Sequence, residues 1–271
     1  LASLEPSLAG RGPKAIRQRG VLADALRAFA RAGGGSLDDL VRLLHDLPAT
    51  ASRIAEAGEV AREIARQLVV TMAANPLFDV AETALDPAEL FAGESGRTRV
   101  SVVNLAGLSG EAARDFVNRL HMTLFCWIKA HPGPAERLYV LDEAHDCLPA
   151  KETTPCKRSA FALAAQGAKY GLGMVFATGE PRALDPAAIS GCLTQIYGRM
   201  SSPAGLETVK AMMAARGGAA DDLGRLKPGE FYFVTEGLSR PIKIRTPPCL
   251  SRRAQNPPTS EEVAAIARRR A

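Results

Sequence analysis

The apolar residues of this 271-residue chain change their spacing near residue 97, and this change constrains the fold more than any other feature. Before it, three segments carry apolar residues at helical spacing: 16–31, 37–47 and 54–72. After it, short β-rich runs alternate with helical segments. The pattern predicts an N-terminal all-α subdomain over residues 1–97, followed by an α/β layer with a mostly parallel sheet flanked by helices.

Turn and cap residues mark where the predicted helices of the first part begin and end. The run Gly33-Gly34-Gly35 breaks the first helix. Ser36, followed three residues later by Asp39, is typical of a helix N-cap with an acidic first turn. Pro48 ends the second helix. These signals support the helical subdomain.

The second part is predicted to alternate strands and helices as far as residue 216. We expect strands over residues 99–105, 138–141, 173–178 and 193–198. We expect helices over residues 111–129, 158–170, 185–190 and 203–216. A hairpin over 231–235 and 241–244 follows, and a proline-containing linker leads to a last helix over 259–270. The expected domains after the helical subdomain are a core over 98–247 and a basic C-terminal linker and helix over 248–271.

Composition excludes several classes of protein. With 46% hydrophobic and 23% charged residues, the chain is typical of a globular protein and not of a disordered or collagen-like one. No run approaches the roughly 18 apolar residues of a membrane span, and the first residues lack the apolar stretch of a signal peptide. Five scattered cysteines without a CxxC pair indicate reduced thiols, with no zinc site or disulfide framework. We expect a cytoplasmic protein without a membrane partner.

The strongest local signal is a short apolar run followed by two carboxylates. Leu138 to Leu141 lead directly into Asp142 and Glu143, which places both acids at the carboxyl edge of the predicted sheet. In nucleoside triphosphatases this pattern, called Walker B, sets the aspartate near magnesium and lets the glutamate act as a general base toward water. A strand that ends at a solvated acidic turn is the alternative interpretation.

Several ordered motifs around this strand resemble one family of ATPases. They include FVNRLHMTLFCWIKAHP, LYVLDEAHD, ALAAQGAKYGLGMVFAT, TQIYGRMSSPAGLETVKAMMAARGG and LKPGEFYFVTEG. Over residues 98–262 the chain resembles the C-terminal half of the HerA-like ATPases, which belong to the FtsK–HerA group of ring-forming DNA translocases. The resemblance implies a partial RecA-like P-loop NTPase core that binds ATP and Mg2+ in a hexameric ring around double-stranded DNA. It also implies Walker B roles for Asp142 and Glu143, with Asp142 near the metal, and a sensor role for Thr178.

The chain departs from this family at the phosphate-binding loop. The Walker A motif binds phosphate through backbone amides, a lysine and a hydroxyl that ligates magnesium. None of the eight lysines follows a glycine or precedes Ser or Thr, so these 271 residues contain no Walker A motif. We therefore expect a fragment or the product of a split gene, with an N-terminal Walker A half as its partner. Hydrolysis is expected only with that half, whose absence would leave strand edges unpaired.

A second departure affects the sensor. The family usually continues Ala-Thr with Gln, whereas Gly179 and Glu180 follow Thr178 here. Glycine has no side chain to reach a phosphate or a water molecule, which weakens the expectation that hydrolysis is coupled to motion. A degenerate, non-catalytic ATPase-fold module for oligomerisation or partner binding is therefore the alternative function.

Further polar residues are candidates for the nucleotide site. Ring ATPases of this group present an arginine to the γ-phosphate from the same or a neighbouring subunit. Arg199 in YGRMSSP is the first candidate and Lys169 in AKYG the second, and a solvated surface charge is the alternative for each. Asn104, at the end of its predicted strand, faces the site or serves in a turn. His145 is expected to contact a nucleotide or DNA or only to begin a helix, and His121 to be a satisfied core or interface histidine.

The charge distribution adds an expectation about partners. The net charge is +5, and the stretch after residue 239 holds eight basic residues against two glutamates, a local +6 that leaves −1 for the rest. We expect salt-dependent contacts with DNA or a neighbouring subunit through this stretch. The expected function is thus the C-terminal portion of a HerA-like ATP-dependent DNA translocase or helicase, with a nuclease as a further candidate partner.

Overall fold

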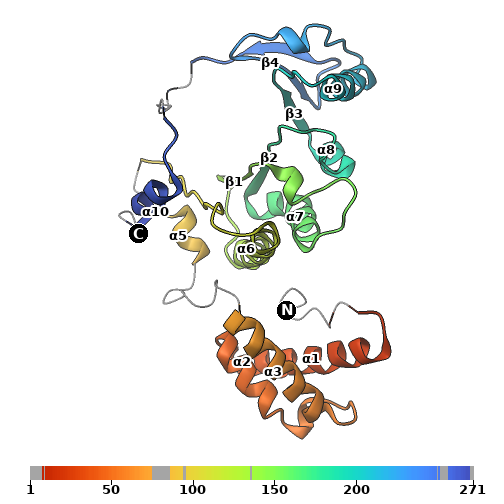
Figure 1. Ribbon diagram of the computed structural model, residues 1–271, viewed down its shortest axis with the longest axis vertical. Helices are drawn as coiled ribbons and strands as arrows, with labels where there is room; N and C mark the ends of the chain where they lie inside the picture. Colours follow the sequence, from red (N-terminus) through yellow and green to blue (C-terminus); the bar gives the residue numbers. More distant parts are fainter. Residues whose placement is uncertain are drawn as a thin grey trace. The chain divides into compact units, whose positions relative to one another are not determined.

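The computed structural model describes residues 8, 10–74, 86–93, 96–134, 136–248, 250 and 256–268. The chain divides into two compact units, Leu1–Asp86 and Pro87–Ala271. Figure 1 shows the elements of each unit. No helix in the described ranges is long and apolar enough to cross a bilayer. Of the basic residues after residue 239, Arg252, Arg253, Arg269 and Arg270 lie outside the described residues, as does Cys249.

The first unit is helical over its described residues, and the predicted subdomain boundary at residue 97 stays a prediction. Its helices are α1 (Pro13–Arg31), α2 (Leu37–His45), the short η2 (Ala49–Ala51) and α3 (Ala57–Ala74). Ser36 caps α2 with a complete capping box: its Oγ accepts the amide of Asp39, and the Asp39 carboxylate accepts the amide of Ser36. Leu44, Ile64 and Leu68 are fully buried in the core that the helices share.

The second unit contains most of the predicted α/β elements. They are α5 (Pro87–Phe91), α6 (Gly110–Ala130), β1 (Arg137–Leu141), η3 (Ala144–Asp146), α7 (Pro155–Gln166), η4 (Gly167–Tyr170), β2 (Leu172–Phe176), α8 (Pro186–Gly191), β3 (Thr194–Tyr197), α9 (Pro203–Ala215), η5 (Leu223–Arg225), β4 (Glu230–Thr235), β5 (Ile242–Arg245) and α10 (Ser260–Arg268). Strands β1 and β2 are parallel. The mixed α/β fold class with a parallel sheet and flanking helices is therefore confirmed.

One face of the β1–β2 pair is packed and the other is bare. Tyr139 and Leu141 alternate with Leu138 and Val140, so the two sets point to opposite faces. Tyr139 and Leu141 pack into the clusters built with α6 and α7. Leu138 and Val140 are 61% and 55% exposed, and Val175, beside Val140 on β2, is 41% exposed. Since such residues are normally covered in a parallel sheet, this face is suited to a further layer of structure.

The predicted strand over residues 99–105 is wrong. These residues form no strand, and Val100 and Val102 are 79% and 83% exposed. A β-rich run becomes a strand only where a neighbouring backbone accepts its hydrogen bonds and a surface covers its side chains. Among the described strands none pairs with this run, so its composition alone does not order it.

The fourth predicted strand exists but belongs to a different sheet. Strand β3 pairs antiparallel with β4, and β4 pairs antiparallel with β5, so the three form a separate sheet. Tyr197 of β3 packs with α9 and with Met200 around a core of its own. The predicted closing hairpin, formed by β4 and β5, is confirmed. Strand β3 pairs with the free edge of β4 and does not join the parallel sheet. The prediction that this strand belongs to the mostly parallel sheet is therefore wrong.

An ion pair joins the first turn of α7 to the start of α8. The Lys157 ammonium lies 2.5 Å from the Asp185 carboxylate, and the two side chains are only 13% and 15% exposed. Lys157 also donates to the carbonyls of Pro149 and Glu152. The hydrogen bond from Lys157 to the Asp185 carboxylate lowers the pKa of Asp185.

Replacement of Lys157 by methionine is expected to lower the free energy of unfolding of the second unit by about 2 kcal/mol, because Asp185 would lose its partner in a largely desolvated position. Urea denaturation followed by the fluorescence of Trp127, the single tryptophan, measures this unit. The matched control is Lys210→Met on the exposed side of α9, which should change it by less than about 0.5 kcal/mol. Equal effects of the two substitutions would contradict the structural role of the pair.

Candidate functional site

The carboxyl ends of β1 and β2 meet and bring the predicted Walker B acids beside the predicted sensor. Asp142 and Glu143 follow β1, and Thr178 follows β2 by two residues. Two backbone hydrogen bonds continue the pairing beyond the strands: the amide of Ala177 donates to Leu141 over 3.0 Å, and that of Ala144 donates to Ala177 over 2.8 Å. The parallel order thus places these polar side chains at one sheet edge, where α/β folds bind ligands.

Glu143 adopts an unusual backbone conformation at this edge. Its φ is +45°, in the left-handed region, and among the described residues only Glu56 shares a positive φ without being glycine. A glutamate in that region is strained by about 1 kcal/mol or more, and such strain often accompanies a functional constraint. The turn is held by Asp142, whose carboxylate accepts the Glu143 amide over 3.0 Å. The Glu143 side chain remains 61% exposed, so it can meet a water molecule or a ligand.

His145 connects the general-base candidate to the sensor. Its Nδ1 lies 3.0 Å from the Thr178 hydroxyl and 3.4 Å from a Glu143 carboxylate oxygen. The Thr178 hydroxyl already accepts the amide of Glu180 over 3.0 Å, which leaves its proton free to be donated to Nδ1. The side chain of His145 is 23% exposed. His145, predicted to contact a nucleotide or DNA or only to begin a helix, therefore contacts both the predicted Walker B glutamate and the predicted sensor threonine, and only the strand pairing reveals this link.

The residues at this edge fit magnesium in part. Asp142 is exposed and makes no ion pair with another described residue, so one oxygen is available to a cation. Mg2+ is usually held by one or two carboxylates with water and substrate phosphates, which suits a single aspartate. Within the described ranges no group of three or more histidine, cysteine, aspartate or glutamate side chains could hold a metal by itself. The edge thus supplies a metal ligand and a base, while the 271 residues lack the lysine loop that would hold ATP phosphates.

The other predicted site residues lie away from this edge. Asn104 is exposed, and its side chain accepts the amide of Ala106 over 3.0 Å, which is the turn role. Lys169 lies in η4, before β2, and therefore at the opposite end of that strand from Thr178. Arg199 follows β3 and lines a small hollow with Phe231 in the antiparallel sheet. None of the three joins the Walker B acids within one chain, so their nucleotide roles stay predictions.

A series of buried hydrogen bonds lies on the packed face of β1, below the site. His121 of α6 is fully buried, and its two ring nitrogens contact Ser159 of α7 over 3.0 Å and Tyr139 of β1 over 3.1 Å. Burial lowers the pKa of His121 to about 4 and raises the pKa of Tyr139. Ser159 donates onward to the carbonyl of Cys156. The prediction of a satisfied core histidine is confirmed, and the chain of contacts ties β1 to both helices beneath it.

Comparison with known proteins places the fold. No protein-family model and no curated protein matches the chain. The bacterial conjugative coupling protein TrwB matches 95% of this chain and 68% of its own, with a TM-score of 0.52 and 14% sequence identity. The plasmid coupling protein TrwB in complex with the GTP analogue GDPNP matches 94% of this chain and 70% of its own, with a TM-score of 0.51. At this identity the likeness establishes the fold alone.

A weaker likeness is found to the genome packaging NTPase B204 from Sulfolobus turreted icosahedral virus 2. The complex of B204 with AMP is 20% identical, with a TM-score of 0.40 over 50% of this chain, and the chain spans 63% of the B204 length. The complex with sulfate has a TM-score of 0.43. These scores are too low to support an argument. The match to TrwB, over nearly the whole chain, shows that the protein shares the mixed α/β fold of that coupling protein.

Proposed function

We propose that this chain is the Walker B portion of an ATP-dependent DNA translocase of the HerA type. The observation that carries the proposal is the open sheet edge at which Asp142, Glu143 and Thr178 converge through His145. A base, a metal ligand and a hydroxyl sensor are what phosphoryl transfer to water requires of this side of a site. Asp142 would hold Mg2+, Glu143 would take the proton of the attacking water, and Thr178 would respond to the terminal phosphate.

A Walker A segment would have a place to bind beside β1. Strand β1 pairs only with β2 among the described strands, and the face that carries Leu138, Val140 and Val175 is bare. A Walker A segment that added a strand beside β1 would bring its phosphate loop to the carboxyl edge, and a helix that followed this strand would cover the bare face. In this proposal the complete site forms in a hexameric ring that encircles double-stranded DNA, with the basic C-terminal stretch at a subunit or DNA contact. A neighbouring subunit would supply Arg199 or Lys169, since neither reaches the edge in its own chain.

Purified residues 1–271 are expected to show no ATP hydrolysis above background, because no lysine loop fixes the phosphates. Addition of the polypeptide segment that carries a GxxxxGK[ST] motif, expressed with this chain, is expected to produce turnover that depends on Mg2+. A coupled phosphate-release assay measures both. Turnover by the 271 residues alone would contradict the need for Walker A.

The alternative is a non-catalytic module, and Gly179 favours it. The position is exposed, and a side chain built at Gly179 would meet no atom within 4 Å. No neighbouring group therefore constrains the residue that follows Thr178. The DNA sequence immediately upstream of the coding region separates the two functions. A Walker A motif in frame supports the translocase, whereas a genuine start codon at this point supports a module that keeps the fold for oligomerisation or partner binding.

A further inference from the structure

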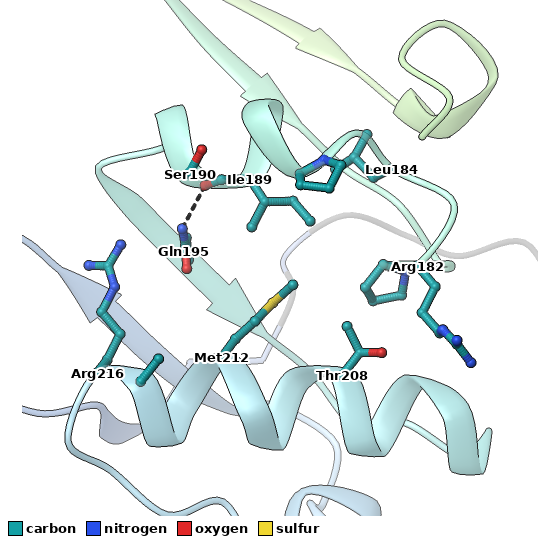
Figure 2. Close-up of a pocket in the computed structure, with 11 residues that line it drawn as sticks. Arg182, Leu184, Ile189, Ser190, Gln195, Thr208, Met212 and Arg216 are labelled. Carbon is teal, nitrogen blue, oxygen red and sulfur yellow. Dashed lines mark hydrogen bonds between the residues drawn. The ribbon is translucent and has the colours of Figure 1, made fainter. Parts of the chain in front are cut away.

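An open groove of about 450 Å³ lies between α8, β3 and α9, in the part of the chain that follows the sensor strand (Figure 2). Its walls come from three consecutive elements, and the loop that enters α8 closes one end. None of its lining residues belongs to the Walker B edge. The groove is therefore separate from the proposed nucleotide site.

The walls of the groove are held in place without a ligand. The amide nitrogen of Gln195 on β3 donates to the carbonyl of Ile189 in α8 over 2.7 Å, and its oxygen accepts the Tyr197 hydroxyl over 2.7 Å. Asp185 caps α8 through the amide of Ala187. Because the polar atoms of Gln195 are satisfied within the wall, they do not compete for an incoming group. The groove is thus preformed, which lowers the entropic cost of binding.

The inner surface of the groove is apolar. Leu184 and Ile189 line one side and belong to the core shared with α7 and β1, while Met212 of α9 lines the other. Met212 is partly exposed, and its unbranched thioether adapts to the shape of an apolar guest. Figure 2 shows the Met212 side chain pointing from α9 toward Ile189. An apolar side chain of about leucine size would remove this surface from water.

The two charged residues that line the groove are both positive. Arg182 and Arg216 are the charged residues that line it, and no carboxylate does. Both are exposed, and neither makes an ion pair or a side-chain hydrogen bond with a residue in the described ranges. In Figure 2 the two arginines stand at opposite ends of the row formed by Thr208 and Met212 on α9. An apolar groove with a free guanidinium at each end is complementary to a ligand with an apolar centre and an anion on either side.

We propose that this groove binds an acidic peptide of a partner protein, with an apolar side chain against Met212 and Ile189 and carboxylates paired to Arg182 and Arg216. A nucleic acid strand is disfavoured, because no aromatic residue lines the groove to stack with bases and a phosphate backbone would leave the apolar surface uncovered. The proposal does not depend on the proposed ATPase function. Its surface is offered by the 271 residues as they stand.

The test is fluorescence polarisation with a labelled hexapeptide, Asp-Glu-Leu-Leu-Glu-Asp, and the full 271-residue chain. We expect saturable binding that falls at least tenfold in each of Arg182→Glu and Arg216→Glu, and about tenfold in Met212→Gln. The matched control is Arg158→Glu on the exposed side of α7, which should change affinity less than twofold. A peptide with lysines in place of the acids should not bind. Urea midpoints equal to that of the wild type verify that the variants are folded.

Several results would overturn the proposal. No saturable binding up to millimolar peptide would do so, as would equal binding of the lysine peptide. Binding of a labelled single-stranded oligonucleotide that shows the same dependence on Arg182 and Arg216 would assign the groove to nucleic acid. Self-association of the chain that Met212→Gln abolishes would assign it to a second copy of this protein.

Discussion

Acidification from pH 7 to pH 4.5 is expected to lower the free energy of unfolding of the second unit by about 2 kcal/mol through His121 alone. Burial lowers the pKa of this histidine to about 4, from its ordinary value of about 6.5. The unfolded chain therefore binds a proton as the pH falls below about 6.5, whereas the folded chain does not until about pH 4. The stabilisation is present above the unfolded pKa and is lost as the pH falls through this window.

The structure explains why the neutral form is held. Ser159 donates to the Cys156 carbonyl, so its oxygen accepts the Nδ1 proton of His121, and Nε2 then accepts the Tyr139 hydroxyl. An added proton on Nε2 would meet the hydroxyl of Tyr139, whose own pKa is raised by burial and which stays protonated throughout this range. A charged imidazole at 0% exposure would also lose its hydration.

Urea denaturation of wild type and His121→Gln at pH 7 and pH 4.5, followed by Trp127 fluorescence, measures the effect. The variant is expected to be less stable at pH 7, because glutamine reproduces only part of the contacts, and to lose about 2 kcal/mol less on acidification. Comparison of the two pH differences removes the contribution of carboxylates that titrate in both proteins. His45→Gln serves as the control, since His45 is exposed and belongs to the first unit. Equal pH dependence of the wild type and His121→Gln would contradict the neutral buried state.

Glu143→Gln is expected to lower ATP turnover at least 100-fold in the complex that carries the Walker A segment. Glutamine keeps the size of the side chain but removes the base, and general-base catalysis typically contributes 10²–10⁴-fold. Nucleotide affinity should change little, because the phosphates are held by the Walker A loop and by magnesium. Phosphate release and equilibrium binding of a fluorescent ATP analogue separate these two effects.

The control for this substitution is Glu207→Gln, an exposed glutamate of α9 far along the chain from Walker B. It should leave turnover within twofold of the wild type. Equal turnover in Glu143→Gln and wild type would contradict the general-base role and leave β1 with the solvated acidic turn that is the alternative interpretation. A joint loss of binding and turnover would indicate that Glu143 shapes the loop and does not act as a base. Its left-handed backbone conformation is the reason to test this second role.

Local signals predicted those elements whose stability is local. The N-cap signal of Ser36 and Asp39 and the apolar spacing of α1 and α6 place these helices within a few residues of their observed bounds. The Walker B acids were equally visible, because a short apolar run before two carboxylates is contiguous in the chain. In the helices and at the acids after β1, the residues that form the signal lie within four positions of each other along the chain.

Strand pairing was predicted less well, because it depends on residues that are distant in the chain. Val100 and Val102 have the composition of a strand, yet no described strand pairs with their segment. Thr194 and Gln195 pair with Thr235 and Val234 across forty residues, and nothing near β3 indicates that an antiparallel partner wins over the parallel sheet. The contact of His145 with Thr178 has the same origin, since it requires β1 and β2 to lie side by side.

The sequence by itself determined a helical first unit, an α/β second unit, the positions of Asp142 and Glu143 and the lack of a lysine loop. These follow from spacing and neighbours along the chain. Only the tertiary structure decided that β3 leaves the parallel sheet, that one face of β1 is bare, that His145 links Glu143 to Thr178 and that Arg182 and Arg216 flank one apolar groove. Each of these depends on which backbones find hydrogen-bonding partners and which apolar faces find cover, and both are settled by the free energy of the whole fold.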